Sequence, residues 1–289
     1  MRSVANPEHV LQRRVAEISI LVTALRIRST SFAAPAERFG RCEKPIFSRP
    51  AAAFTVIELL VVVGIIVLLA GLLLPVLTRS KRSAQVVKCA VQLHQLGLAA
   101  QMYWDDNAGN AFRWRGANTN NGQVYWFGWM ETGNEGERRF DLMQGALYPY
   151  LSGRGVEVCP AFNYLSPRLK LKATGASYGY GYNLSLSAPL TDPPVRVSQI
   201  TRPSELALLA DAAQVNTFQA PASPEHPMIE EFYYVSTNEA TVHFRHQRMA
   251  NVVFCDGHAA REKSSPGSLD RRLANEVIGR LRDEILVIW

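Results

Sequence analysis

Histidine and cysteine side chains gather in the segment Thr241–Ala260, at spacings that suit a metal ion. Each of two pairs is separated by two residues: His243 and His246, then Cys255 and His258. Imidazole nitrogens and thiolate sulfurs at such spacings are typical ligands of zinc. The same segment also fits a β-hairpin, with one strand over Ala250–Cys255, a turn at Asp256-Gly257 and a return strand from His258 onward. Because successive side chains of a strand point to opposite faces, Cys255 and His258 need not face the same way, which weakens the zinc interpretation.

Catalysis and calcium binding have less support in the sequence. Four side chains are candidates for a hydrolytic site: Asp211, Asp256, His243 and His246. They are not accompanied by a recognisable nucleophile with a matched base, and the sequence lacks the short motifs of serine hydrolases, zinc peptidases and nucleotide-binding loops. We therefore expect a protein that is not an enzyme. Asp105, Asp106 and Asn107 carry enough oxygen atoms to be considered for calcium, but their default role is a turn, so no cofactor is expected.

Aromatic side chains form a second group with potential for binding. Four of the five Trp lie between positions 104 and 129, beside Tyr125 and Phe127. Such a cluster can hold a sugar or a peptide, but more often it is the core beneath a sheet or a contact between subunits.

One long apolar run must anchor the rest of the chain. Phe54–Leu77 contains 24 residues with Glu58 as the only charge, and the basic segment Thr78–Arg82 follows it. A helix of this length would be about 36 Å long, enough to cross a hydrocarbon core of about 30 Å. The run therefore predicts a single membrane-spanning helix. Four Lys or Arg lie within the 20 residues on either side, so charge does not set its orientation.

The positive charge of the chain is concentrated at its N-terminus. The whole chain has 31 Lys and Arg against 25 Asp and Glu, a net charge of +6. Residues 1–53 account for nine of the basic and four of the acidic residues, which leaves a net charge of +1 for the remainder. A basic patch for polyanions is not supported, so nucleic acid is not an expected partner.

Glu58 lies at the fifth position of the apolar run, where an unpaired carboxylate is costly in lipid. A free α-amino group is the nearest candidate partner, and it exists only if the chain is cut just before Phe54. The amine of a neighbouring copy would then neutralise Glu58 during lateral assembly. Alternatively, the carboxylate reaches the headgroups from the end of the helix. The residues alone leave both interpretations open.

The residues around this position resemble a known processing motif. Arg49–Glu58 reads RPAAAFTVIE, which is similar to the N-terminal motif of type IV prepilins and type II secretion pseudopilins. The resemblance implies that a prepilin peptidase cleaves between Ala53, where the family usually has Gly, and Phe54, which is then N-methylated. It also implies that Glu58 pairs with the N-terminus of a neighbouring subunit and that Pro75 kinks the helix.

A second signature resembles the C-terminal H-X9-DG motif of prepilin-like proteins. It consists of His246, nine intervening residues, and then Asp256 and Gly257. Further landmarks of that family occur in the same order, around Cys159-Pro160 and Asp211, so the resemblance covers about residues 54–260. It favours the hairpin over the zinc site, with His246 hydrogen-bonded to Asp256, and no metal ion is expected.

Periodicity predicts the remaining elements. Apolar residues at helical spacing over Ser83–Tyr103 extend the membrane helix as an amphipathic stem, which ends in the turn residues 105–109. Short apolar runs predict a mainly antiparallel sheet with strands over 124–130, 155–158, 177–182, 206–210, 232–235 and 250–255. Apolar residues at every fourth position predict a C-terminal helix over 270–289: Leu273, Val277, Leu281 and Ile285. Among the cysteines left after cleavage, Cys89 and Cys159 are the pair expected to form a disulfide in a periplasmic head.

Together these patterns predict an α+β protein of the type IV pilin-like class. It would have a long N-terminal transmembrane and stem helix, a mainly antiparallel β-sheet head and a C-terminal helix. The expected parts are a cleaved leader over 1–53, a transmembrane helix over 54–77, a stem over 78–105, and a periplasmic head over 106–289 that includes the hairpin at about 241–262.

The resemblance implies a structural subunit of a type II secretion pseudopilus or a pilus-like fibre, held in the bacterial inner membrane by a single span. Its partners would be like or related pseudopilin subunits, prepilin peptidase, and the secretion or pilus assembly machinery. Two alternatives come from other classes of protein. One is a membrane-anchored periplasmic binding protein that holds a polysaccharide or a peptide on the Trp-rich segment, and the other is an anchored zinc hydrolase.

Overall fold

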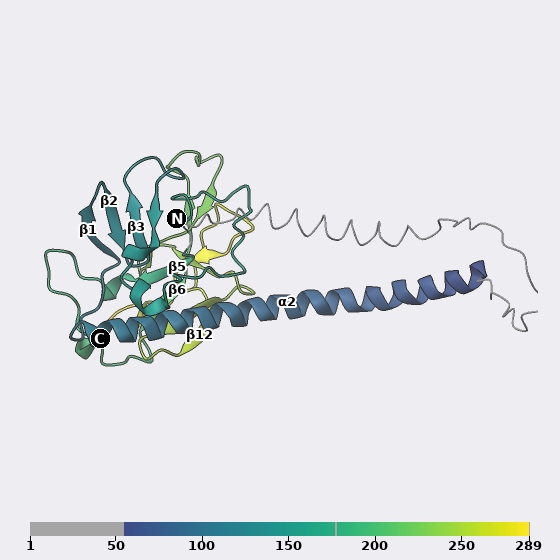
Figure 1. Cartoon of the computed structure of the whole chain (residues 1–289), viewed down its shortest axis with the longest axis horizontal. Coiled ribbons are helices and arrows are strands. Elements are labelled where there is room, and N and C mark those ends of the chain that lie inside the picture. The colour runs from purple at the N-terminus through teal and green to yellow at the C-terminus, as the bar shows by residue number, and fades with distance from the viewer. Residues whose placement is uncertain (1–54, 177, 289) are drawn as a thin grey trace, which may run out of the picture. The chain divides into compact units, whose positions relative to one another are not determined.

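The computed structural model describes residues 55–176 and 178–288 (Figure 1). The chain divides into two units, Met1–Leu59 and Leu60–Trp289. In the first unit, Thr55 and Glu58 form a capping box at the start of a helix. The Glu58 carboxylate accepts hydrogen bonds from the backbone N and the hydroxyl of Thr55, both at 2.8 Å, and Glu58 N donates to Thr55 Oγ1 at 3.3 Å.

The helix α2 spans Val56–Asp106, a continuous run of 51 residues. At 1.5 Å per residue it is about 76 Å long. The expected membrane helix and the expected stem are therefore parts of one helix, which contains Pro75. The Thr78 hydroxyl donates to the Pro75 carbonyl at 2.9 Å, close to the position where proline removes a backbone donor. The helix ends in a turn at Ala108 and Gly109, whose φ values of 53° and 74° are left-handed.

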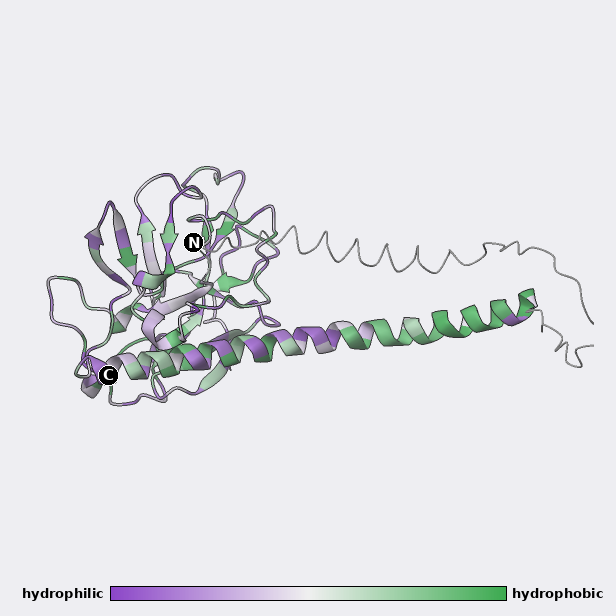
Figure 2. Cartoon of the chain, in the orientation of Figure 1, coloured by the Kyte–Doolittle hydropathy of each residue, from purple (hydrophilic) through white to green (hydrophobic). Residues whose placement is uncertain are grey.

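The two halves of α2 have different surroundings. Every residue from Val56 to Leu77 is exposed, and this helix is long and apolar enough to cross a membrane. Figure 2 shows the change from this mainly apolar half to a half in which polar and apolar residues are mixed. In the second half, buried side chains recur every three or four residues, at Cys89, Leu93, Leu96, Ala100 and Trp104. This spacing produces one apolar face, as the sequence predicts.

The head is built around a five-stranded sheet with the order β12-β11-β6-β5-β9. Its strands pair antiparallel except β5 and β9, which are parallel. Their bounds are β5 Tyr180–Asn183, β6 Ala207–Asp211, β9 Tyr234–Val235, β11 Ala250–Phe254 and β12 Ala259–Glu262. The predicted mainly antiparallel sheet is confirmed.

Three smaller sheets surround the central one. An antiparallel four-stranded sheet has the order β1-β2-β3-β4, with β1 Arg115–Thr119, β2 Gly122–Tyr125, β3 Gly128–Glu131 and β4 Phe140–Asp141. Two antiparallel pairs are β7 Gln214–Asn216 with β8 Met228–Glu230, and β10 Val242–His243 with β13 Ile278–Gly279. Short 3-10 helices connect them: Leu142–Gln144, Tyr148–Leu151, Leu184–Leu186, Val197–Gln199 and Asp283–Ile285.

The central sheet has a different partner on each face. Val253 of β11 belongs to the core cluster that contains the buried face of α2, whereas its neighbours Val252 and Phe254 pack with Leu281 and Leu286 of the C-terminal segment. This alternation is the two-residue period of a strand that is buried on both faces. The stem helix covers one face of β11, and the C-terminal segment covers the other.

The predicted C-terminal helix over 270–289 is wrong. Within 270–288 the structure has strand β13 and a 3-10 helix over Asp283–Ile285. The apolar residues at every fourth position do not share one face, because Leu273 packs in a separate cluster from Leu281 and Ile285. Tertiary packing and the pairing of Ile278 with His243 outweigh the weak helical preference of the segment.

Several strand predictions need smaller corrections. Residues 155–158 form no strand, and the predicted strand 124–130 is divided between β2 and β3 by a turn at Trp126-Phe127. The other four predicted strands overlap β5, β6, β9 and β11.

Candidate functional site

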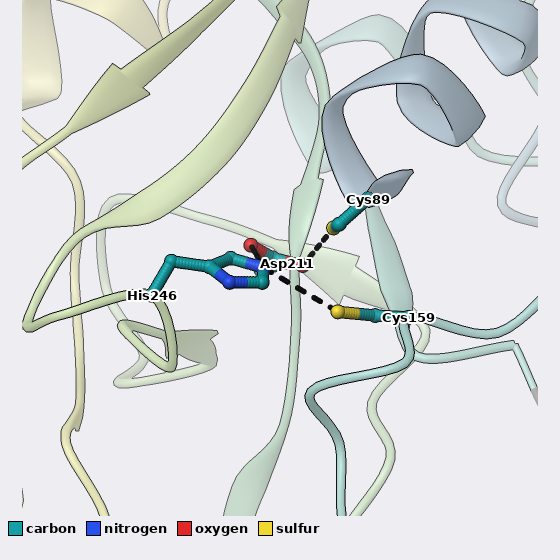
Figure 3. A group of neighbouring side chains, drawn as sticks. All are labelled: Cys89, Cys159, Asp211 and His246. Carbon is teal, nitrogen blue, oxygen red and sulfur yellow. Dashed lines mark hydrogen bonds and ion pairs between the residues drawn. The ribbon is translucent and has the colours of Figure 1, made fainter. Parts of the chain in front are cut away.

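A compact group of buried side chains lies between the stem helix and the head. It consists of two thiols, a carboxyl and an imidazole: Cys89, Cys159, Asp211 and His246 (Figure 3). One potential ligand atom from each lies within 4.8 Å of the others, and all four residues are buried. Because the residues come from four segments far apart in the sequence, only the folded head brings them together.

Each member of the group is positioned by its own element. Cys89 lies on the buried face of α2, and Asp211 is the last residue of β6. His246 precedes a tight turn in which Gln247 and Arg248 have φ values of 57° and 63°. Its backbone N donates to Met249 O at 3.0 Å, and Met249 N donates back at 3.2 Å, so the turn is closed at both ends.

Cys159 lies in a loop that is tied to both the head and the stem. Its carbonyl accepts from Phe162 N at 3.0 Å, which closes a turn. The next carbonyl, that of Pro160, accepts from Gln85 Nε2 of α2 at 3.1 Å. The loop is thus held where the sulfur of Cys159 faces the helix residue Cys89.

Short contacts link the four side chains. Cys89 Sγ donates to Asp211 Oδ1 at 3.2 Å, and Cys159 Sγ lies 3.3 Å from His246 Nε2. The same His246 Nε2 lies 3.3 Å from Asp211 Oδ2. The guanidinium of Arg245 stands beside the group, with Nε 3.6 Å from Asp211 Oδ1.

Burial and charge shift the pKa values of the group in opposite directions. Burial raises the pKa of Asp211, and the Arg245 guanidinium opposes that shift. The pKa of the Cys159 thiol is lowered, first by its hydrogen bond with Cys89 and then, against the effect of burial, by His246 and Arg245. Burial, the same hydrogen bond and the Asp211 carboxylate raise the pKa of Cys89. Within this pair the pKa of Cys159 is therefore lower than that of Cys89.

The group is not arranged as a catalytic triad. In a nucleophile–histidine–acid relay the two ring nitrogens serve different partners. Here Cys159 and Asp211 both face Nε2 of His246. The Asp211 and His246 side chains are 0% and 1% exposed, and both cysteines are 0% exposed, so a substrate has no access. A closed set of ligand atoms of this kind can hold a metal ion or cross-link the fold.

The structure brings together residues that the sequence analysis treated separately. His246 was one of four low-ranking zinc candidates, and Cys89 and Cys159 were the expected disulfide pair. The two cysteines are adjacent as free thiols in the same group. Asp211 is predicted together with His246 as a candidate for a hydrolytic site, and it is also one of the landmarks of the family resemblance. No spacing in the sequence connects these residues, since each comes from a different element.

The other zinc candidates lie outside the group. His243 is buried and its Nε2 lies 3.0 Å from Glu276 Oε2. His258 is bound to Asp256, with Nδ1 2.6 Å from Oδ1, and Cys255 is a buried free thiol. The expected hydrogen bond between His246 and Asp256 is wrong, because His246 faces Asp211 and Cys159 while Asp256 accepts from His258.

The predicted hairpin is confirmed. Strands β11 and β12 pair antiparallel, and Phe254 N donates to His258 O at 2.9 Å across the turn. Gly257 has a φ of 91°, which favours glycine. Its carbonyl lies 2.7 Å from His94 Nδ1 of α2, so the turn packs on the stem helix.

The Trp-rich segment is mostly core. Trp104, Trp126 and Trp129 are buried, and the indole N–H groups of the last two donate to the carbonyls of Tyr233 and Thr119 at 2.9 and 2.8 Å. Only Trp114 of this set is partly exposed. The segment therefore supplies a packed interior, which is the more common use of such a cluster.

Two further groups complete the buried polar interior. Glu230 is fully buried and pairs with Lys170 and Lys172 at 3.0 and 2.9 Å. Glu231 accepts hydrogen bonds from Tyr178 N at 2.8 Å and from the Tyr164 hydroxyl. Burial raises the pKa of Glu231 to about 7 even though these donors favour its ionised form.

The residues considered for calcium lie at the end of α2. Asp105 and Asp106 are exposed on its last turn, and Asp106 Oδ2 accepts from the Tyr150 hydroxyl at 3.0 Å. Asn107 Nδ2 donates to Tyr103 O at 2.8 Å, in keeping with a role in the turn. Ala53 and Phe54, the residues of the expected cleavage, lie outside the described residues.

Comparison with known proteins found no match for the chain. No protein-family model matches it, and searches of the curated proteins and of the solved structures found no match.

Proposed function

We propose that the chain is a pilin-like structural subunit, anchored by the apolar half of α2 and assembled with like or related subunits through that helix. The observation that carries this proposal is the difference in burial between the two halves of α2. Its second half is packed into the head through one face, whereas residues Val56–Leu77 are exposed around the whole circumference. Apolar residues on all sides of a helix require lipid or other helices as neighbours.

The start of the helix supports the same proposal. In the capping box Glu58 satisfies the backbone N–H of Thr55, so the carboxylate is held at the helix end rather than projecting along it. In a chain cut before Phe54, the new α-amino group would lie one residue before Thr55. A carboxylate held at the N-terminal end of the helix can attract the α-amino group of a neighbouring subunit. The helix N-terminus itself favours negative charge at this position.

The proposal includes processing by a prepilin peptidase and a head on the periplasmic side. Its support is the RPAAAFTVIE motif at 49–58, together with an uninterrupted helix that begins at Val56, within three residues of the proposed cut. The anchored binding protein lacks a comparable observation, because three of the four Trp in its candidate surface are buried.

N-terminal mass spectrometry of the protein from native membranes tests the processing. The expected result is a chain that begins with N-methylated Phe54. A mature chain that retains residues before Ala53 would contradict the proposal, because the amine next to Glu58 would not exist.

Assembly is tested separately by Glu58→Gln, which keeps the capping geometry and removes the charge. Recovery of cross-linked subunits from membranes should fall at least tenfold, with the amount of monomer unchanged. The matched control is Glu205→Gln, which removes an exposed carboxylate of the head. Equal cross-linking by both variants and the unchanged protein would contradict assembly through Glu58.

A further inference from the structure

The four buried side chains at the junction of stem and head have the separations of ligands around one metal ion. Zinc bonds of 2.0–2.3 Å arranged tetrahedrally place neighbouring ligand atoms about 3.3–3.8 Å apart. The contacts in the group are 3.2 Å from Cys89 Sγ to Asp211 Oδ1, 3.3 Å from Cys159 Sγ to His246 Nε2 and 3.3 Å from His246 Nε2 to Asp211 Oδ2, so Cys89 and His246 meet different oxygen atoms of the Asp211 carboxylate. No pair of ligand atoms in the group exceeds 4.8 Å.

We propose that Cys89, Cys159, Asp211 and His246 bind one zinc ion that fastens the stem helix to the head. Two sulfur atoms and an imidazole nitrogen select zinc over calcium and magnesium, which prefer oxygen ligands. Four protein ligands complete a tetrahedron without an open position, and the group is closed to solvent. The site is therefore structural and not catalytic.

The charges around the site balance when zinc is bound. Two thiolates and one carboxylate contribute three negative charges, and the ion contributes two positive charges. Arg245, whose Nε lies 3.6 Å from Asp211 Oδ1, supplies the third positive charge. Its side chain is only 3% exposed, and its Nη2 donates to the carbonyls of Gly179 and Ala212 at 2.7 and 3.0 Å. A neutral set of charges lowers the cost of burying the site.

Neighbouring groups orient the ligands. Asn251 N donates to Asp211 Oδ2 at 2.8 Å, and the Tyr180 hydroxyl lies 3.5 Å from Cys89 Sγ. The single hydroxyl proton of Tyr180 is donated to Gln92 Oε1 at 3.0 Å, one turn further along the stem helix, so Tyr180 packs beside the Cys89 sulfur without donating to it. The hydrogen bond from Asn251 N is of the kind that holds a metal ligand in the geometry that the ion requires.

A disulfide between Cys89 and Cys159 is the competing account of the two thiols. It would use both sulfur atoms but leave Asp211 and His246 without a function in the group. Zinc instead accounts for all four side chains and for the direction in which His246 Nε2 points. It would also join four distant segments of the chain at a single point: α2, the Cys159 loop, the end of β6 and the turn before β11.

Metal analysis of the full-length protein in detergent, purified without chelators, tests the proposal directly. We expect about one zinc ion per chain, removable by a strong chelator. Cobalt added to the stripped protein should give the visible absorption bands of a tetrahedral ion with thiolate ligands. Both measurements use the unchanged protein, so they do not depend on whether a variant folds. Protein with less than a tenth of an equivalent of zinc and no cobalt bands would overturn the proposal.

Variants identify the ligands. Cys89→Ser and Cys159→Ser should each lower zinc content or affinity at least tenfold, whereas Cys255→Ser, which removes a buried thiol outside the group, should leave one equivalent bound. Zinc retained by the first two variants would overturn the assignment. So would peptide mapping under non-reducing conditions that recovers Cys89 and Cys159 joined as a disulfide. The proposal does not depend on filament assembly, because the measurement is made on the isolated chain.

Discussion

Gly97 lies where the stem helix packs tightly against strand β11 of the central sheet. A Cβ atom added at this position would lie 2.7 Å from Val253 Cγ2 of β11 and 3.6 Å from Gly257 Cα. Val253 is 0% exposed and has a β-branched side chain that is stiff at χ1, so it cannot turn away freely. Gly97→Ala should therefore push the helix and the strand apart.

The size of the effect follows from two opposing contributions. Alanine in place of glycine favours a helix by about 1 kcal/mol. Overpacking a closed core costs about 1–3 kcal/mol. We expect Gly97→Ala to lower the free energy of unfolding of the head by the difference, about 0–2 kcal/mol. Val253→Ala alone should cost about 2 kcal/mol by leaving a cavity. In the double variant the new methyl group partly fills that cavity, so the cost of the double variant should be about 1–2 kcal/mol smaller than the sum of the costs of the two single variants.

Urea unfolding of the full-length protein in detergent, followed by the fluorescence of the buried Trp residues, measures these energies. Gly71→Ala is the matched control: it makes the same change in the apolar half of α2, where a Cβ meets nothing within 4 Å, and it should leave head unfolding unchanged. A stabilised Gly97→Ala variant would refute the close packing of the stem helix on β11. Costs of the single variants that simply add in the double variant would refute it equally.

Three further predictions concern the interior of the head. The pKa of Glu231 is about 7 in the folded head and near 4.5 in the unfolded chain, so the unfolded chain loses this proton at lower pH. The free energy of unfolding should therefore fall by about 3 kcal/mol as pH rises from 4.5 to 7. Urea titrations of Glu231→Gln should lack this decline, and an equal decline in the variant would contradict the prediction. Glu230→Gln removes the fully buried carboxylate between Lys170 and Lys172 and leaves Glu135 as the acidic partner of both lysines, so it should cost about 1–3 kcal/mol in the same assay. Glu131→Gln, at a surface pair with Arg139, should cause no measurable change. Leu281→Ala should cost about 2–5 kcal/mol, because Leu281 is 0% exposed beneath the sheet, and a loss below 1 kcal/mol would show that the C-terminal segment is not part of the core.

Local patterns were enough to predict the elements whose stability depends on near neighbours. The apolar run and the three- and four-residue spacing of Cys89, Leu93 and Leu96 predict α2, and Asp256-Gly257 between two strand-like runs predicts the hairpin. The prediction of a C-terminal helix was wrong because the apolar residues of this segment are distributed between two clusters, which periodicity cannot reveal. The pattern of every fourth residue was real, but it does not describe one face of a helix.

The candidate site could not be predicted from the sequence for a related reason. Zinc-like spacing drew attention to His243, His246, Cys255 and His258, which are close in sequence. In the folded head only His246 of these meets Cys89, Cys159 and Asp211. Ligands contributed by four distant elements leave no spacing to read, and each residue alone is ordinary for its position: a cysteine on a buried helix face, an aspartate at the end of a strand.

The nine residues between His246 and Asp256 connect two places where the head contacts the stem helix. Asn251 Nδ2 donates to Val86 O at 3.2 Å, Val253 packs at Gly97, and the Gly257 carbonyl lies 2.7 Å from His94 Nδ1, so strand β11 and the turn after it are attached to the stem helix at several points. One residue more or fewer would shift the turn by about 3.3 Å and reverse the faces of the strand beyond it. The imidazole and the turn would then no longer reach their places on the helix together. The contacts of His246 with Cys89 and of Gly257 with His94 therefore restrict the number of residues that can lie between His246 and Asp256.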